Sequence, residues 1–564
     1  MKPWWKDRVA YQIYPRSFRD SEGPGGAPGD GIGDIQGIIS RLDELKSLGI
    51  GIIWLSPVYK SPGADNGYDI SDYYAVDPIF GTMADMERLF AEAAKRDIRI
   101  IMDMVINHTS DEHEWFQKSR DPSSPYREYY IWRPPKPAKK PGGKPRLPNN
   151  WTGFFMEDVW EYDEKSGEYY LHLFHKKQPD LNYQNPKVLE EIKKIFRFWL
   201  DKGAAGFRCD VINIIYKASL EDGKKSLAVR GIEHYQSQEG NHAVLRELRR
   251  DVLDKYDCFT VGETVMVDLP EAKLLCGESR GELDMLFYFE HLEIDRRIAR
   301  FIPKKFKASK LLEVLTKWQQ GLEWNAVYLE NHDQPRVVSH FGAGDDGGKA
   351  GGYWARSAKM LALMELTLRG TVFIYQGQEI GMTNFDFKSL DQVKDVESHN
   401  LDRLMKKLHI PGPLRWKWIK ASSRDNARTP VQWSSGANAG FSNSRPWLGV
   451  NSNYRRINYE SQKNDPASVL NFYKKLIALR LENECLKSGA FVPLYADTRL
   501  MIYSRELEGE TWTALLNFSG RTVKLPFATA GVRSAREPAV SNTCRADLEG
   551  KLLPWEGALF HQTS

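Results

Sequence analysis

The sequence predicts an α/β protein built on a (β/α)₈ TIM barrel, with an inserted domain after the third strand and a C-terminal antiparallel β-sandwich domain. Strand-like apolar runs alternate with amphipathic helical stretches through most of the 564 residues. In addition, three acidic residues far apart in sequence, Asp210, Glu263 and Asp333, each follow an apolar run. The carboxyl ends of barrel strands all open on one face, so these three side chains should meet in one cleft.

The first three strands can be placed from their apolar pattern. Residues 9–18, 50–59 and 98–107 are strand-like, and the third run is almost continuously apolar, as parallel strands buried on both faces are. Residues 82–97 between the second and third runs have helical spacing. The apolar face of this helix carries Met86, Leu89, Phe90 and Ala93.

The remaining units follow the same order. Residues 186–203 predict a helix with an apolar stripe, and Gly203 is placed to end it because glycine adopts the left-handed conformation of a C-cap. A strand then runs into Asp210. Further strands are predicted to end at Glu263, near Phe289, at Asp333 and near Gln376, which brings the barrel to eight units.

Two changes of pattern divide the chain. Residues 108–181 lose the strand–helix period, are rich in Trp, Tyr and Pro, and contain a basic, proline-rich run at 134–146, which predicts an inserted domain with a mobile loop. From residue 486 the chain alternates apolar and polar residues with turn signals, as antiparallel strands do. The predicted domains are the barrel (1–107 and 182–485), the inserted domain (108–181) and the C-terminal domain (486–564).

Composition limits the possible partners and compartment. The 79 Lys and Arg residues against 75 Asp and Glu give a net charge of +4, which predicts neither nucleic acid nor a charged membrane as a partner. The five cysteines show no paired or metal-ligand spacing, which favours reduced thiols. No apolar run reaches about 18 residues. We therefore expect a soluble, cytoplasmic protein, and we expect it to be a monomer.

The three acids suit the hydrolysis of a glycoside with retention of configuration. One carboxylate must attack the anomeric carbon while a protonated carboxyl about 5 to 5.5 Å away donates to the leaving oxygen. Asp210 and Glu263 are candidates for these two roles. Asp333 would be a third acid that holds substrate hydroxyls and stabilises an oxocarbenium-like transition state.

Longer motifs point to a known family. Four segments resemble the four signature regions of the α-amylase superfamily of glycoside hydrolases: DMVINH (103–108), GFRCDVIN (206–213), GET (262–264) and ENHDQPR (330–336). Other stretches are similar to its oligo-1,6-glucosidase and α-glucosidase branch, namely residues 65–73, 178–183, 376–382 and 423–433. The resemblance runs in one consistent order from about residue 4 to about residue 480.

The resemblance implies roles for the catalytic residues. Asp210 would be the nucleophile, Glu263 the general acid/base and Asp333 the stabiliser of the transition state. Arg208 lies two residues before Asp210, so both side chains should point to the same side of the strand. We expect the Arg208 cation to keep Asp210 ionised by lowering its pKa.

The resemblance also implies residues that bind the first glucose unit. His108 and His332 match histidines that hydrogen-bond its hydroxyls, and Tyr68 matches the aromatic platform beneath it. Asp65 and Arg428 match the pair that closes the pocket behind the non-reducing end, which would make the enzyme exo-acting.

Val211 relates to linkage preference. In this branch the residue after the nucleophile is commonly Val in enzymes that cleave α-1,6 bonds and Ala in those that prefer α-1,4 bonds, and here it is Val211. The other explanation is ordinary strand propensity, because Val suits strands.

A metal site is expected in the loop after the first strand. Related sequences carry a compact acidic metal loop there, and Asp20, Asp30 and Asp34 with the Ile32 carbonyl could surround a structural Ca²⁺ or Mg²⁺ ion, although several residues are inserted after Asp20. No organic cofactor is expected.

The favoured function is a retaining, exo-acting α-glucosidase that hydrolyses terminal α-1,6-linked glucose in isomaltose, isomaltulose or short isomaltooligosaccharides. The alternatives are a sucrose isomerase (isomaltulose or trehalulose synthase), a trehalose-6-phosphate hydrolase, or a broad or α-1,4-specific α-glucosidase. Residues 293–297 only partly resemble the Arg-rich motif of sucrose isomerases. A non-catalytic relative, such as an ancillary subunit of an amino-acid transporter, would lack part of the acidic set and carry a membrane span.

Overall fold

A computed structural model describes residues 2–23, 29–138, 146–226, 229–297, 302–349, 352–526 and 537–563. Within these ranges the largest sheet has eight strands, all paired in parallel, in the order β11–β10–β9–β5–β2–β1–β15–β14. That order follows the chain around a ring, and β11 lies against β14 where the ring closes. The predicted barrel is confirmed. Its strands are β1 (Ala10–Ile13), β2 (Ile52–Leu55), β5 (Arg99–Met104), β9 (Gly206–Cys209), β10 (Phe259–Glu263), β11 (Met285–Phe287), β14 (Ala326–Val327) and β15 (Thr371–Tyr375).

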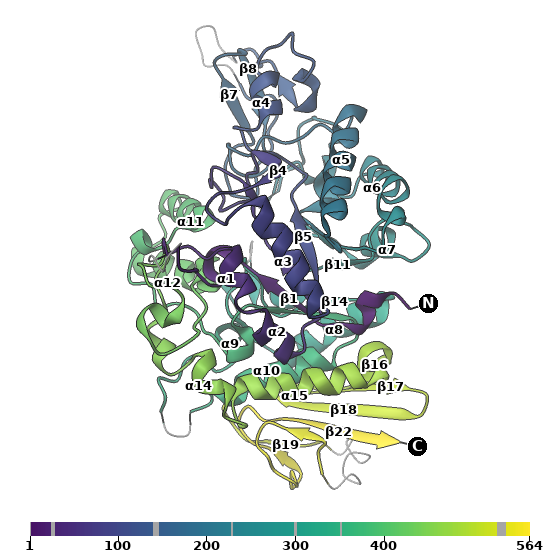
Figure 1. The fold of residues 1–564 in the computed structure, drawn as a ribbon, viewed down its shortest axis with the longest axis vertical. Coiled ribbons are helices and arrows are strands. Elements are labelled where there is room, and N and C mark those ends of the chain that lie inside the picture. The colour runs from purple at the N-terminus through teal and green to yellow at the C-terminus, as the bar shows by residue number, and fades with distance from the viewer. Residues whose placement is uncertain are drawn as a thin grey trace.

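Helices surround this sheet (Figure 1). The two helices predicted in detail are α3 (Met83–Lys95), which begins with a Thr82–Asp85 capping box, and α5 (Pro186–Lys202), which ends at Gly203 with φ 114°. The others on the barrel are α1 (Ile35–Ile39), α2 (Leu42–Leu48), α6 (Glu239–Asp251), α7 (Leu269–Cys276), α8 (Ala308–Gly321) and α10 (Trp354–Thr367).

The strands are shorter than the apolar runs that predicted them, and β14 differs most. It ends at Val327, so Asp333 lies on a loop six residues later and not at a strand end as predicted. Polar side chains turn the backbone away from the sheet. Asn331 Oδ1 accepts from Asp333 N at 2.8 Å, and the Glu330 carboxylate accepts from Arg336 Nη1 at 3.0 Å.

The inserted segment carries its own small sheet at one end of the molecule (Figure 1). Strands β6 (Trp132–Arg133), β8 (Glu168–Leu171) and β7 (Trp160–Asp163) pair antiparallel in that order, beside helix α4 (Glu114–Ser119). Residues 139–145, which hold most of the run interpreted as a mobile loop, lie outside the described residues.

A second helical excursion follows the last barrel strand. Helices α11 (Val396–Lys407) and α12 (Gly412–Ser422) form a hairpin that contacts the inserted segment. Asn400 Nδ2 donates to the Phe155 carbonyl oxygen at 3.0 Å, and Arg403 pairs with Glu157 at 3.2 Å. Three parts of the chain therefore surround the barrel mouth: the strand ends, the inserted segment and this hairpin.

The C-terminal part is an antiparallel sheet at the opposite end of the molecule from the inserted segment (Figure 1). Its strand order is β16–β17–β18–β22–β20, and a separate pair is formed by β19 (Val523–Lys524) and β21 (Lys551–Leu552). The five strands are β16 (Ala490–Ala496), β17 (Leu500–Leu507), β18 (Glu510–Asn517), β20 (Val540–Ser541) and β22 (Gly557–Thr563). None of the helices in the described ranges has the length and apolarity needed to cross a bilayer.

Two buried arginines join this sheet to the barrel. Arg480, on α15 (Val469–Glu482), donates to the carbonyl oxygens of Leu366, Leu368, Leu486 and Gly370. Arg505, on β17, donates to those of Thr367, Leu486 and Gly489. Both guanidinium groups thus donate hydrogen bonds to carbonyl oxygens at the C-terminal end of α10 and in the segment that follows α15. The last carbonyls of a helix have no partner within the helix, so they need such donors.

Candidate active site

Asp210 and Glu263 lie on neighbouring strands and share one arginine. Asp210 directly follows β9 and Glu263 is the last residue of β10, which pairs with β9 in parallel. Arg208 Nη1 lies 2.6 Å from Asp210 Oδ1, and its Nη2 lies 2.5 Å from Glu263 Oε2. The same Nη1 lies 2.8 Å from Asp103 Oδ1. One buried guanidinium therefore holds three carboxylates at the mouth of the barrel.

The single positive charge of Arg208 faces three carboxylates, and this environment affects the pKa of Asp210. Burial raises the pKa of Asp210 well above its usual range; Arg208 opposes the rise, whereas the carboxylates of Glu263 and Asp103 add to it. The predicted effect of Arg208 is present, but burial outweighs it. A raised pKa opposes the ionised form that Asp210 needs as a nucleophile, and the Arg208 cation is the neighbour that favours this form.

Asp333 has the opposite environment. Its Oδ1 is paired with Arg428 Nη2 and lies 3.6 Å from Arg424 Nη1, while Oδ2 lies 3.6 Å from His332 Nε2. Burial alone would raise the pKa of Asp333, but His332, Arg424 and Arg428 hold it well below its usual range. Asp333 is therefore ionised, as a carboxylate that stabilises developing positive charge must be.

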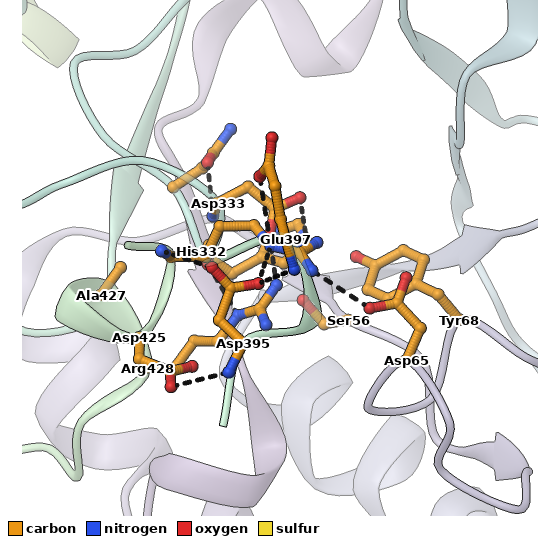
Figure 2. A network of polar contacts seen from close by, with 12 residues as sticks. Ser56, Asp65, Tyr68, His332, Asp333, Asp395, Glu397, Asp425, Ala427 and Arg428 are labelled. Atoms are coloured by element: carbon orange, nitrogen blue, oxygen red, sulfur yellow. Dashed lines mark hydrogen bonds and ion pairs between the residues drawn. The ribbon is translucent and has the colours of Figure 1, made fainter. Parts of the chain in front are cut away.

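The cation that pairs with Asp65 is not the one predicted. Asp65 Oδ1 lies 3.3 Å from Arg424 Nη2, whereas Arg428 binds Asp333 and donates from Nε to the His332 carbonyl oxygen at 3.1 Å (Figure 2). The two arginines are four residues apart around the short helix α13 (Asp425–Arg428), so both reach the same region. The sequence motif contains both arginines and does not show which of them forms the ion pair with Asp65.

The other predicted binding residues gather at the same place. The Tyr68 ring stacks on His332 with centroids 5.2 Å apart, and its hydroxyl donates to Asp103 Oδ2 at 2.9 Å. His108 Nε2 lies 3.1 Å from Gln178 Nε2, which in turn lies 3.4 Å from Asp65 Oδ2. Burial lowers the pKa of His332 to about 3 and also lowers that of His108, so both rings are neutral at physiological pH.

Comparisons with known proteins agree with this geometry. The family model described as "Alpha amylase, catalytic domain" matches residues 12–489, which is most of the chain. The chain belongs to the α-amylase family. An oligo-1,6-glucosidase from Parageobacillus thermoglucosidasius is 46% identical to it, over 99% of this chain and 98% of that protein.

Solved structures of two other kinds of enzyme are also similar to this member of the α-amylase family. A trehalose-6-phosphate hydrolase from Bacillus licheniformis matches with a TM-score of 0.89 and 40% identity, covering 100% of both chains. An isomaltulose synthase variant from Erwinia rhapontici NX5, solved with D-glucose, matches with a TM-score of 0.92 and 38% identity, again over 100% of both chains.

Val211 joins the nucleophile to the inserted segment. Its backbone is left-handed, with φ 36° and ψ 41°, which is rare for a β-branched residue. Its side chain is buried in a cluster that includes Ile131, Leu171 and Tyr235. The predicted linkage-determining residue of this α-amylase-family chain therefore lies where the barrel meets the inserted segment.

Several residues around the site were not singled out from the sequence. Buried Lys217 pairs with Asp180 Oδ2 at 2.7 Å and donates to Asn107 Oδ1 at 2.7 Å, next to His108. Asp395 lies 2.8 Å from Arg424 Nε, and Glu397 lies 3.7 Å from it (Figure 2). Asp180 stands in a stretch matched to the family, which was an available signal. Lys217, Asp395 and Glu397 stand in no such stretch.

The expected metal ligands of the first loop bind protein groups in this structure. Asp20 Oδ2 accepts from Gly31 N at 2.8 Å, and Asp34 Oδ1 caps α1 by accepting from Gly37 N at 2.6 Å. Asp30 Oδ1 accepts from Ile32 N at 2.8 Å. Across the described part of the chain, no group of three or more His, Cys, Asp or Glu side chains is placed to hold a metal ion. As placed, these residues do not fit the ion, and the metal stays a prediction.

Proposed function

We propose that this α-amylase-family protein is a retaining, exo-acting α-glucosidase that hydrolyses terminal α-1,6-linked glucose in isomaltose, isomaltulose and short isomaltooligosaccharides. One observation carries the proposal: Asp210 and Glu263 lie at the ends of neighbouring strands and are bound by the two terminal nitrogens of one buried arginine, Arg208. The 46% identity to an oligo-1,6-glucosidase over nearly the whole chain supports the choice of substrate.

The residues can perform double displacement. Asp210 attacks the anomeric carbon as Glu263 protonates the glycosidic oxygen, so the bond to the leaving sugar breaks and a glycosyl ester forms on Asp210. Glu263, now ionised, takes a proton from water as that water attacks the same carbon; the ester bond to Asp210 breaks, glucose is released and Asp210 is again a carboxylate. Asp333 remains ionised beside its two arginines and stabilises the positive charge that develops on the ring.

The exo-acting character rests on the polar residues that gather around Asp65. The Asp65–Arg424 ion pair, Gln178 and His108 are linked by contacts of 3.1 to 3.4 Å and are buried. Their donors and acceptors suit the hydroxyl groups of a terminal glucose unit. A chain that continued beyond that unit would have to displace the ion pair.

Hydrolysis of α-1,6 bonds is favoured over the alternatives by Val211 and by the relatives. The trehalose-6-phosphate hydrolase and isomaltulose synthase matches are 40% and 38% identical, below the 46% of the oligo-1,6-glucosidase. Incubation with isomaltose, maltose, sucrose and trehalose-6-phosphate, followed by product analysis, tests the choice. We expect glucose release from isomaltose to be fastest. Conversion of sucrose to isomaltulose, or preferential cleavage of trehalose-6-phosphate, would replace the proposal with the corresponding alternative.

We further propose that the protein acts as a monomer in the cytoplasm on small oligosaccharides. All five cysteines are free thiols, as a reducing compartment would keep them. Size-exclusion chromatography with light scattering tests the oligomeric state.

A further inference from the structure

Gln12 lies directly behind one of the proposed substrate-binding histidines. It is on β1, one residue before the strand ends, and is almost fully buried. Its Nε2 lies 2.8 Å from His332 Nδ1 and 3.2 Å from Ser56 Oγ. Gln12 therefore contacts the edge of the imidazole that faces away from Asp333.

The His332 ring is held in one plane by aromatic neighbours. The Tyr68 ring stacks on the imidazole with a centroid distance of 5.2 Å and an interplanar angle of 1°. The Tyr14 ring also stacks on it, with a centroid distance of 6.0 Å and an interplanar angle of 14°. The Trp54 ring meets the imidazole edge-on at 6.0 Å. With the plane fixed, the hydrogen bonding of His332 depends on which ring nitrogen carries the proton.

The surroundings of the ring select one tautomer. His332 is neutral and carries one proton, while its Nε2 lies 3.6 Å from the ionised Asp333 Oδ2. A neighbouring carboxylate favours the proton on Nε2, and Nδ1 must then accept a hydrogen bond. The Gln12 amide nitrogen supplies that donor, and the buried Gln12 Oε1 has no hydrogen-bond partner among the residues that the structure describes.

We propose that Gln12 is a positioning residue that fixes His332 as the Nε2–H tautomer. In this form His332 donates to a sugar hydroxyl in the first subsite and keeps a favourable contact with Asp333. The inference deepens the proposed function and rests on it for the identity of the substrate.

The tautomer can be read without any substrate. Long-range ¹H–¹⁵N spectra of protein labelled with ¹⁵N-histidine distinguish protonated from unprotonated ring nitrogens, and His332→Gln assigns the signal. We expect Nε2–H in the wild type. In Gln12→Glu we expect a proton on Nδ1, because a carboxylate can only accept there. Nδ1–H in the wild type, or no change in Gln12→Glu, would overturn the proposal even if the enzyme proved to act on a different glucoside.

The control is Gln376→Glu. Gln376 follows β15, is equally buried, and its Oε1 accepts from Tyr14 N at 2.8 Å, an acceptor role that a glutamate keeps. This variant places a carboxyl at the neighbouring strand end without making the Nδ1 contact. We expect it to leave the His332 tautomer unchanged and kcat/KM within about threefold of the wild type, since the Tyr14 N–H keeps its acceptor.

Kinetics on isomaltose provide a second readout. Gln12→Leu should lower kcat/KM by about 10- to 100-fold at all pH values. Gln12→Glu should show a similar loss at alkaline pH and recover as the pH falls, because the introduced carboxylate raises the His332 pKa and the imidazolium again donates from Nε2. Parallel losses without that recovery would contradict a role in setting the tautomer. Failure of the wild type to cleave any glucoside would reject the proposed function instead, and the spectra would still decide the role of Gln12.

Discussion

Arg208 illustrates how one side chain can prepare a site for two different roles. Its guanidinium is shared by Asp103, Asp210 and Glu263, so a single positive charge faces three acids. This shared charge only partly offsets burial, so the pKa of Asp210 stays raised.

The roles of Asp210 and Glu263 can be separated by the choice of leaving group. Glu263→Gln should lose much more activity on isomaltose than on an activated aryl α-glucoside, whose leaving group hardly needs a proton. Asp210→Asn is the matched control and should lose activity equally on both, because attack on the anomeric carbon is common to them. Comparison of kcat/KM for the two variants on the two substrates provides the measurement; an equal loss for Glu263→Gln would reject the acid/base role.

The raised pKa of Asp210 predicts a pH dependence. The nucleophile must be ionised, so activity should fall as the pH drops through that raised pKa, at a higher pH than a solvent-exposed aspartate would give. Asp103→Asn removes one nearby negative charge and one competitor for Arg208, and both changes lower the pKa of Asp210. The acid limb of kcat/KM should therefore move to lower pH. A limb that stays in place or moves upward would contradict this account.

Val211 should control linkage preference. Val211→Ala removes two methyl groups between the nucleophile and the inserted segment, which should raise maltose cleavage relative to isomaltose by about 10- to 200-fold in kcat/KM. Val159→Ala serves as the control, since Val159 is buried in the same cluster but belongs to the inserted segment. It should lower stability and leave the ratio unchanged. If both variants alter the ratio alike, the cluster and not the Val211 side chain determines linkage.

At the scale of elements, apolar patterns located the strands better than they located the strand ends. The helices at 82–97 and 186–203 were predicted nearly to their observed bounds, because capping residues mark their ends. The predicted strands extended past the observed strand ends, because residues beyond those ends, such as Ser56 and Val105, are buried as well. The partner of Asp65 could not be predicted, because Arg424 and Arg428 lie one helical turn apart and only packing separates them.

The loop that follows the first barrel strand provides a test of metal binding. Its acids already accept hydrogen bonds from Gly31, Gly37 and Ile32. We predict that these acids rearrange around the expected ion, so dialysis against EDTA should lower the melting temperature and added calcium should restore it, because an ion that binds only the native state stabilises it. An unchanged melting temperature with no bound metal would contradict the site. A clear rise in the presence of calcium, with bound metal found by elemental analysis, would show that the acids rearrange into the expected site.

At the scale of the whole molecule, the barrel, the inserted segment and the C-terminal sheet follow from the order of strand-like and helix-like runs. The contacts between these three parts cannot be predicted from that order. Arg480 and Arg505 are separated by 25 positions and meet at the same helix end, where both donate to backbone carbonyls, and no local pattern marks this contact. Likewise, the contact between Asn400 and the Phe155 carbonyl depends on the three-dimensional arrangement.

Arg505 should bind the C-terminal sheet to the barrel. Arg505→Met removes the side-chain donor of the Thr367 and Gly489 carbonyls, whereas Leu486 keeps its hydrogen bond from Arg480. The loss should cost about 1 to 3 kcal/mol in the free energy of unfolding, since a buried polar atom without its partner is destabilising. Calorimetry should show a lower melting temperature with kcat/KM unchanged. Arg499→Met, at an exposed position in the turn before β17, is the control and should have little effect. An unchanged melting temperature for Arg505→Met would show that the contact is dispensable.

The ion pair between Asp65 and Arg424 also affects how an oligosaccharide would be degraded. If this ion pair closes the far end of the proposed exo-acting pocket, the pocket has a single opening, and the released glucose must leave by the route through which the oligosaccharide entered. The enzyme then cannot act processively and must release its substrate after every cleavage. Degradation is then distributive, intermediates of every length accumulate in solution, and glucose competes with each new chain for the same entrance.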